Sequence, residues 1–223
     1  FDRDSLFVLP RGVDTGVFHP GARDPGYWGR YRCNGAFKFL YVGRISPEKN
    51  LEALIDSFSE LRAEGAPAQL VVVGDGPQLP ALRRKTRKRS DILFTGVLEG
   101  DDLVAAYAGA DVFVFPSTTD TFGNSVLEAQ ACGLPAVVSG RGGPQEIVRN
   151  RESGLVVRLE EEGELTAAMR TLLEDPAVRE RMARNALITA RESDWGRILE
   201  LFWSTGEAPQ QQPEREPCVA SRA

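Results

Sequence analysis

Short apolar segments that stop at glycine or proline recur along the chain, with stretches of helical periodicity between them. A sheet whose strands are this apolar is covered on both faces, which requires parallel strands with helices packed on either side. We therefore predict an α/β fold, a Rossmann-like doubly wound parallel sheet followed by carboxyl-terminal helices. The predicted strands cover residues 37–42, 70–73, 92–95, 112–115, 136–138 and 155–157.

Between the strands, apolar residues recur at three- and four-residue spacing, which is typical of helices with one buried face. We expect Asn50 to cap the helix after the first strand and Asp101 to cap the helix before the fourth. A basic helix should reach about Arg89, another should cover residues 123–132, and two or three more should follow up to Phe202.

The two ends of the sequence differ from its middle. Residues 1–35 lack a clear period and are rich in glycine and proline, so we predict an irregular leader. Residues 36–204 should form the α/β domain. Residues 205–223 are rich in proline, glutamine and glutamate, and we predict a disordered tail.

Composition excludes several classes of protein. A net charge of −5 argues against a dedicated DNA-binding module, so we expect no nucleic-acid partner. The longest apolar run, residues 134–138, is too short to span a bilayer, and the charged start is unlike a signal peptide. Three cysteines without metal-ligand spacing fit a reduced, cytoplasmic protein.

Ligands of open parallel sheets bind at the carboxyl ends of the strands. In this sequence the loops that leave those ends are rich in glycine, small polar residues and charge. Such loops suit a polar, phosphate-bearing ligand that the backbone approaches closely. The loops cover residues 43–49, 74–77, 96–100, 116–124 and 139–143.

Gly74, Asp75 and Gly76 follow an apolar strand, as a nicotinamide dinucleotide fingerprint would. The third glycine of that fingerprint would fall at position 79, which is Leu79. The fingerprint also belongs after the first strand of its unit, and this strand is the second. We interpret the segment as a tight turn.

A metal-dependent sugar transferase would use an Asp-x-Asp motif at a strand end to hold a divalent ion against a diphosphate. Asp2 and Asp4 have that spacing but lie at the amino terminus, off any predicted strand. Asp101 and Asp102 fit a helix cap and its neighbour. We therefore predict no metal site.

Residues 83–89 carry six positive charges in seven positions. Such a run can bind nucleic acid or an anionic membrane. It is also typical of the solvated carboxyl end of a helix, where the helix dipole favours cations. We favour the second interpretation and keep the first as an alternative.

Two other reactive side chains are interpreted as structural. His19 lies between Phe18 and Pro20 in the irregular leader, where a linker role is the better interpretation. Cys132 falls on an apolar helix face, with no second histidine in the chain to activate its thiol. We expect it in the core.

Asp120 and Glu128 stand out by context, since pairs of acids eight positions apart arise by chance. Asp120 lies between a strand end and a helix start, and Glu128 lies more than one turn inside that helix. The free backbone amides of Phe122, Gly123 and Asn124 would form a seat for a phosphate at the helix start. Together these groups predict one site for a sugar nucleotide.

Arg44 and Lys49 follow the first strand, five positions apart, on a loop stiffened by Pro47. Two cations can neutralise a diphosphate leaving group where a metal ion would otherwise be required. The alternative is that both are surface charges that pair with Glu48 or Glu52. The nearby acidic motif favours the functional interpretation.

Six motifs follow one another along the chain, at residues 41–50, 73–77, 94–96, 120–129, 133–135 and 142–146. Together they resemble the carboxyl-terminal, donor-binding half of retaining glycosyltransferases of the GT-B fold, with its E-x7-E motif. The resemblance covers about residues 8–204 and is strongest to the group with sulfolipid synthases and GDP-mannose-dependent mannosyltransferases. Residues 9–18 resemble the crossing from the amino-terminal domain, and residues 195–203 resemble the last helix.

The resemblance implies roles for individual residues. Arg44 and Lys49 would bind the donor diphosphate, Asp120 the hydroxyl groups of the donor sugar, and Glu128 the ribose. Asp120 stands where glutamate is usual, which shortens the arm by one methylene. The segment near Val97 and Leu98 would border the base. The full predicted substrate-binding set is Gly43, Arg44, Lys49, Val97, Leu98, Asp120, Thr121, Phe122, Gly123, Asn124 and Glu128, with Arg44, Lys49 and Asp120 as catalytic residues.

The function that the resemblance implies is retaining transfer of a hexosyl group from a UDP- or GDP-sugar to a hydroxyl acceptor, with no metal ion or other cofactor. The acceptor, a lipid or a glycan, would bind an amino-terminal domain expected to lie outside this sequence, so this chain alone should be inactive. We expect a cytoplasmic location, either free or peripherally associated with the inner face of a membrane. The alternatives are a non-catalytic sugar-nucleotide-binding module and a sugar-nucleotide epimerase of similar fold.

Overall fold

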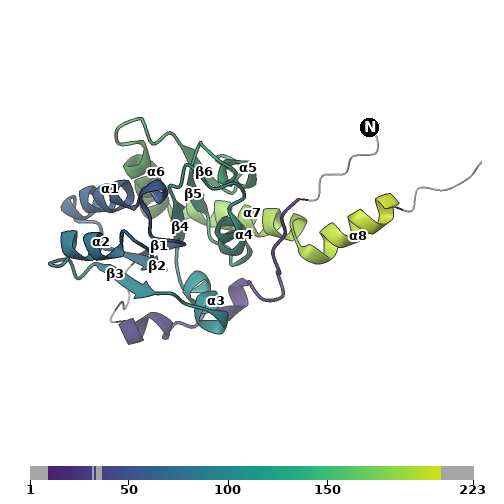
Figure 1. The fold of residues 1–223 in the computed structure, drawn as a ribbon, viewed down its shortest axis with the longest axis horizontal. Helices are drawn as coiled ribbons and strands as arrows, with labels where there is room; N and C mark the ends of the chain where they lie inside the picture. The colour runs from purple at the N-terminus through teal and green to yellow at the C-terminus, as the bar shows by residue number, and fades with distance from the viewer. Residues whose placement is uncertain (1–9, 32, 34–36, 207–223) are drawn as a thin grey trace, which may run out of the picture.

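The computed structural model describes residues 10–31, 33 and 37–206, which form a six-stranded parallel sheet with helices on both faces (Figure 1). The strand order is β3-β2-β1-β4-β5-β6, so the predicted doubly wound α/β fold is confirmed. The strands are β1 (Phe37–Val42), β2 (Ala68–Val73), β3 (Ile92–Gly96), β4 (Val112–Phe115), β5 (Ala136–Ser139) and β6 (Gly154–Val157).

Helices cover the sheet in two layers. The helix α1 packs beside α6, and the ion pair between Lys85 and Asp56 ties α2 to α1. On the opposite face, α4 packs between α3 and α7, as right-handed connections that run in opposite directions from β1 require. The helices are α1 (Leu51–Ala63), α2 (Leu79–Lys85), α3 (Gly100–Ala108), α4 (Asn124–Ala131), α5 (Pro144–Ile147), α6 (Glu164–Glu174), α7 (Pro176–Glu192) and α8 (Trp195–Gly206), with 3-10 helices at Pro20–Ala22, Tyr27–Tyr31 and Pro47–Lys49.

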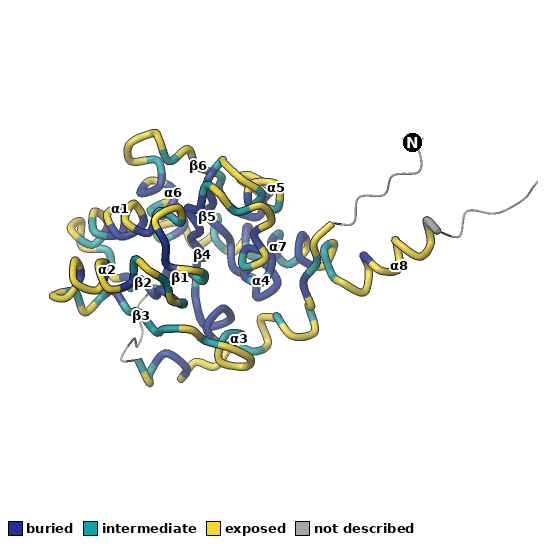
Figure 2. The backbone as a smooth tube through the Cα atoms, in the orientation of Figure 1, coloured by how far each residue is buried: buried dark blue, intermediate teal, exposed yellow. Residues whose placement is uncertain are grey.

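The central strands account for the core. Figure 2 shows them as a buried centre within more exposed helices. Both faces of each central strand are covered, so β-branched and aromatic residues occupy successive positions rather than alternate ones. Fully buried strand residues include Phe39, Leu40, Leu70, Val71, Val72, Val112, Phe113, Val114, Val137 and Val138.

The segment before β1 also packs against this core. Tyr27 and Trp28 are buried in the same cluster as the strands, and the Tyr27 hydroxyl donates to the backbone oxygen of Asp102 at 2.7 Å. The division of the chain at residue 35 stays a prediction. Residues 1–9 of the predicted leader, with Asp2 and Asp4, lie outside the described residues.

The last helix, α8, extends away from the sheet (Figure 1). Its start is fixed to the leader, because the Asp194 carboxylate accepts hydrogen bonds from the amide and the hydroxyl of Thr15. Further along, Leu199 and Trp203 are exposed. The helix continues to Gly206, and residues 207–223 of the predicted tail lie outside the described residues.

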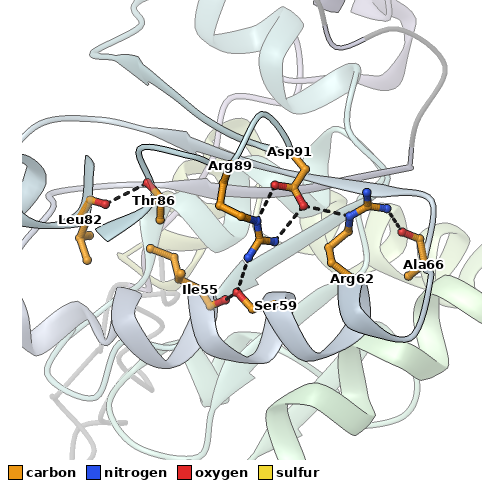
Figure 3. A network of polar contacts seen from close by, with 8 residues as sticks. All are labelled: Ile55, Ser59, Arg62, Ala66, Leu82, Thr86, Arg89 and Asp91. Carbon is orange, nitrogen blue, oxygen red and sulfur yellow. Dashed lines mark hydrogen bonds and ion pairs between the residues drawn. The ribbon is translucent and has the colours of Figure 1, made fainter. Parts of the chain in front are cut away.

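The basic helix ends earlier than predicted, at Lys85 instead of about Arg89. The Arg89 guanidinium turns toward Asp91, with Nε 2.7 Å from Oδ1, and donates to the Ser59 hydroxyl at 2.9 Å (Figure 3). Arg62 donates to the same carboxylate from α1 at 2.9 Å. This network binds Arg89, the last residue of the basic run, into the fold.

The cap predicted at Asp101 is wrong by two positions. Glu99, in extended conformation, precedes the helix, and α3 begins at Gly100, so Asp101 lies in the first turn. An acid there interacts favourably with the helix dipole without bonding to the end amides as a cap does.

Asn50 holds the predicted position before α1, but its side chain does not cap the helix. Its backbone is left-handed, with φ 54° and ψ 34°, whereas a capping residue is extended. Its amide instead donates to the backbone oxygen of Pro116 at 3.0 Å. The residue therefore ties the loop after β1 to the end of β4.

This role of Asn50 predicts graded losses of stability. Asn50→Ala loses the amide donor and tolerates the left-handed backbone poorly, so we expect the unfolding free energy to fall by ~2 kcal/mol. Asn50→Gly loses only the donor and should cost ~1 kcal/mol. Urea denaturation measures both. If both variants lose the same unfolding free energy, the left-handed backbone of Asn50 contributes nothing to the difference. If neither variant loses any, the hydrogen bond to Pro116 does not stabilise the fold.

Asp91 predicts a pH-dependent contribution to stability. Hydrogen bonds from Arg89, and then from Arg62, lower the pKa of this carboxyl, whose side chain is only 15% exposed. The carboxylate therefore stabilises the fold above its unfolded-state pKa, and this contribution is lost as the pH falls through the lower folded-state value. Asp91→Asn should lose ~1–2 kcal/mol at pH 7 and progressively less in acid.

Urea denaturation at several pH values measures this difference. Glu162→Gln is the control, because that carboxylate is exposed and has no partner among the described residues. A deficit for Asp91→Asn that stays constant into strong acid would show that the ionised carboxylate is not its source.

Candidate functional site

The strand order indicates where along the carboxyl ends of the strands a ligand would bind. Strand β1 lies between β2 and β4, and connections leave this point in opposite directions. Doubly wound sheets bind ligands in the crevice at this point. The crevice is flanked by two loops, one after β1 (residues 43–50) and one after β4 (residues 116–123). Asn50 joins the two loops through Pro116.

Lys49 and Asp120 meet across this junction, 71 positions apart in the sequence. The Lys49 Nζ lies 2.6 Å from the Asp120 Oδ2, and the two side chains are 14% and 24% exposed. A cation and an acid that the sequence assigned to different parts of a ligand are thus in direct contact. The pair is partly buried, which reduces its screening by salt.

A buried tyrosine holds the backbone of Arg44 in place. The buried Tyr41 ring stacks on Phe115, with centroids 5.6 Å apart, and its hydroxyl donates to the Arg44 backbone oxygen at 2.8 Å. Burial raises the pKa of Tyr41, so the hydroxyl stays a donor. The Arg44 side chain is exposed and has no hydrogen-bond or ion-pair partner among the described residues.

Two glycines allow the loops to approach each other. A Cβ at Gly74 would lie 2.0 Å from the backbone oxygen of Gly43, and a Cβ at Gly143 would lie 2.0 Å from that of Thr121. The Gly143 amide also donates to the Asp120 backbone oxygen at 2.7 Å. No side chain fits at either glycine, so the loops after β2 and β5 pack directly against the loops that carry the site.

The start of α4 presents unbonded amides. The Val126 amide donates to the Gly123 oxygen at 2.9 Å, whereas the amides of residues 122–125 donate to none of the described residues. Gly123 has φ 79°, and Asn124 begins the helix. Thr121 and Phe122 are exposed, and the Arg11 guanidinium lies 4.3 Å from the centre of the Phe122 ring.

Glu128 lies one turn further along α4, ~6 Å from Asn124 along the helix axis. The Tyr107 hydroxyl donates to its Oε2 at 2.8 Å. Burial raises the pKa of Glu128, and this hydrogen bond opposes the rise. Within the described residues no hydrogen bond or ion pair joins Glu128 to Lys49 or Asp120, so the second acid is held separately from the first.

Val97 and Leu98 follow β3, at the same edge of the sheet but two strands away from β1. Strand spacing puts them ~10 Å from the end of β1. Val97 is 61% exposed, and Leu98 packs partly against the core. The contact of these two residues with a base stays a prediction.

The residues interpreted as structural have structural partners. Asp102 pairs with Arg30 at 3.0 Å. Cys132 is buried, and burial raises the pKa of its thiol to about 12, so it carries no thiolate near neutral pH. Among the described residues, no three histidine, cysteine or acidic side chains gather as a metal site would need, and no helix could cross a membrane.

Three important residues were not predicted for this site. Tyr41 lies on a strand and Tyr107 on a helix, both at positions where the sequence pattern is apolar. Only the hydrogen bonds of their hydroxyl groups distinguish them from ordinary core residues. Asn50 was predicted as a helix cap, and its contact with Pro116 depends on the strand order. None of these pairings has a signal in sequence spacing.

Comparison with curated proteins finds related sequences. The chain is 35% identical over 176 residues to the GDP-mannose-dependent alpha-mannosyltransferase of Corynebacterium glutamicum, which covers 77% of this chain and 40% of that protein. It is 35% identical over 197 residues to the sulfoquinovosyl transferase of Arabidopsis thaliana, with 86% and 38% covered. The chain thus spans about half or less of the length of these relatives.

Solved structures share the fold. The Anabaena protein HepE in complex with UDP superposes with a TM-score of 0.77 at 23% identity, covering 87% of this chain and 55% of that one. The carboxyl-terminal domain of a glycosyl transferase group 1 protein from Francisella tularensis gives 0.72 at 24% identity, covering 81% and 97%.

The sequence profile described as "Glycosyl transferases group 1" matches residues 33–188. The match includes every strand and most of the described helices, and therefore the whole sheet edge where Lys49 meets Asp120. Since it covers well over half of the sequence, the chain belongs to the glycosyl transferases group 1 family.

Proposed function

We propose that this chain is the donor-binding half of a retaining glycosyltransferase, which moves a hexosyl group from a UDP- or GDP-sugar to a hydroxyl acceptor. The observation that carries the proposal is the contact between Lys49 and Asp120 at the point where the strand order reverses. The names of the relatives, a GDP-mannose-dependent mannosyltransferase and a sulfoquinovosyl transferase, support the class of reaction.

In this proposal the diphosphate lies against Arg44, Lys49 and the open amides at the start of α4. The exposed Arg44 guanidinium has no hydrogen-bond or ion-pair partner among the described residues, and Lys49 would exchange Asp120 for a phosphate oxygen. The amides of residues 122–125 add donors aligned with the helix dipole. These groups would stabilise the departing diphosphate without a metal ion.

The acids would hold the two sugars. Asp120, released from Lys49, would accept hydrogen bonds from hydroxyl groups of the donor hexose. Glu128 would accept hydrogen bonds from the ribose, and Val97 and Leu98 would border the base. Carboxylates suit this role because each oxygen accepts more than one hydrogen bond.

The transfer itself would exchange one bond for another at the anomeric carbon. The bond to the diphosphate oxygen breaks, the acceptor oxygen bonds to that carbon on the same face of the sugar, and the proton of the acceptor hydroxyl passes to the departing diphosphate. Arg44, Lys49 and the helix amides stabilise the charge that develops on the diphosphate. The acceptor would be a lipid or glycan bound by an amino-terminal domain, and the enzyme would be cytoplasmic, free or at the inner face of a membrane.

Calorimetric titration with UDP and GDP tests the site. The parent chain should bind one of them weakly, and Lys49→Ala should weaken binding about tenfold or more, because a charge-assisted hydrogen bond contributes ~1.5–3 kcal/mol. Glu128→Gln should weaken binding by a similar factor, since an amide replaces one acceptor oxygen with donors.

Lys88→Ala is the matched control, because it also removes a lysine. Lys88 is exposed and has no hydrogen-bond or ion-pair partner among the described residues. This variant should bind like the parent. Absence of binding to the parent, or unchanged affinity in Lys49→Ala, would refute the site.

A second experiment concerns catalysis. The chain spans only part of its relatives, and the acceptor site is proposed to lie in another domain. We therefore expect no transfer when the chain is incubated with UDP-glucose or GDP-mannose and hydroxyl acceptors, as measured by release of UDP or GDP. Turnover by the purified chain would contradict this division of labour.

A further inference from the structure

We infer that Tyr107 is a positioning residue, whose buried hydroxyl orients the Glu128 carboxylate so that its second oxygen is free to bind a ribose hydroxyl. The inference rests on the proposed function, which assigns the ribose to Glu128. Tyr107 lies on α3, outside every motif that identified the site.

The ring of Tyr107 is fixed on two sides. Its centroid lies 5.8 Å from that of Phe18 in an edge-on arrangement at 80°, and 5.7 Å from that of Phe113 on β4. The residue has no exposed surface. A ring held in this way cannot swing its hydroxyl away, so the hydroxyl is a fixed donor rather than an adaptable one.

The hydroxyl donates to one particular oxygen of Glu128. It lies 2.8 Å from Oε2, whereas Oε1 accepts no hydrogen bond from the described residues and is not buried. One oxygen is therefore anchored to the core and the other is available at the surface. A carboxylate with one anchored oxygen loses less conformational entropy when a ligand binds to the other.

An ordinary core role for Tyr107 explains this arrangement less well. A buried hydroxyl can be satisfied by a backbone oxygen, as the Tyr27 hydroxyl is by Asp102. Here the partner is instead an acid whose partial burial is unfavourable. No cation pairs with Glu128 among the described residues, so its charge is not neutralised before a ligand arrives. This combination suits a ligand-binding acid.

The test compares ribose with deoxyribose. The parent chain and Tyr107→Phe are titrated with UDP and 2′-deoxy-UDP, or with GDP and 2′-deoxy-GDP if the guanine nucleotide binds more tightly. We expect the parent to prefer the ribonucleotide about tenfold, in line with a hydrogen bond to a charged group. Tyr107→Phe should lose most of this preference while its affinity for the deoxynucleotide stays within about threefold.

Two further variants separate positioning from packing. Val104→Ala removes a buried side chain from the same helix, so it loosens α3 but should keep the preference for ribose. Its unfolding midpoint calibrates how far Tyr107→Phe is destabilised. In a Glu128→Ala background, Tyr107→Phe should have no further effect on the preference, because no carboxylate is left to orient.

The outcomes are distinguishable. If the parent binds neither UDP nor GDP, the proposed function fails. If the parent binds ribo- and deoxynucleotides equally, the assignment of the ribose to Glu128 fails, and this inference fails with it. If the parent prefers ribose and Tyr107→Phe keeps that preference, or changes it equally in the Glu128→Ala background, Tyr107 is only a core residue.

Discussion

The junction between the loops after β1 and β4 is the constraint on which the site depends. These loops are separated by more than sixty residues and meet only because β1 and β4 are adjacent. The Asn50 amide then donates a hydrogen bond to Pro116, and the Lys49 ammonium donates one to Asp120. These two contacts bring the candidate functional groups of the loops together. Any change that separates β1 from β4 would divide the cation from the acid.

The fold was predictable because its signal is local. Runs such as residues 112–115, apolar at every position and followed by proline, allow little besides a covered parallel strand, and all six strands were confirmed. Helix ends were less predictable. The early end of α2 depends on Arg89 bonding to Asp91, and the failure of Asn50 to cap α1 depends on Pro116 across the sheet. Both outcomes are decided by tertiary contacts.

The site was predictable in part for the same reason. Motif context indicated Lys49, Asp120 and Glu128, and the structure places the first two in contact, but it holds Glu128 apart on a different partner. Spacing could not show this separation, because α3, which supplies that partner, packs on α4 through the order of the strands. Tyr41 and Tyr107 look like core residues in the sequence. A tyrosine can bury its apolar ring in the core while its hydroxyl group forms a hydrogen bond at the other end of the side chain.

In the proposed function, the ion pair at the junction would also affect which anions compete for the crevice. Asp120 serves as an internal counter-ion for Lys49, so an incoming anion must displace a carboxylate already 2.6 Å from the ammonium. Inorganic phosphate would leave the displaced carboxylate without new partners, whereas a molecule with hydroxyl groups beside its phosphates offers replacements. On this proposal, the contact would favour phosphates that carry hydroxyl groups over simple anions.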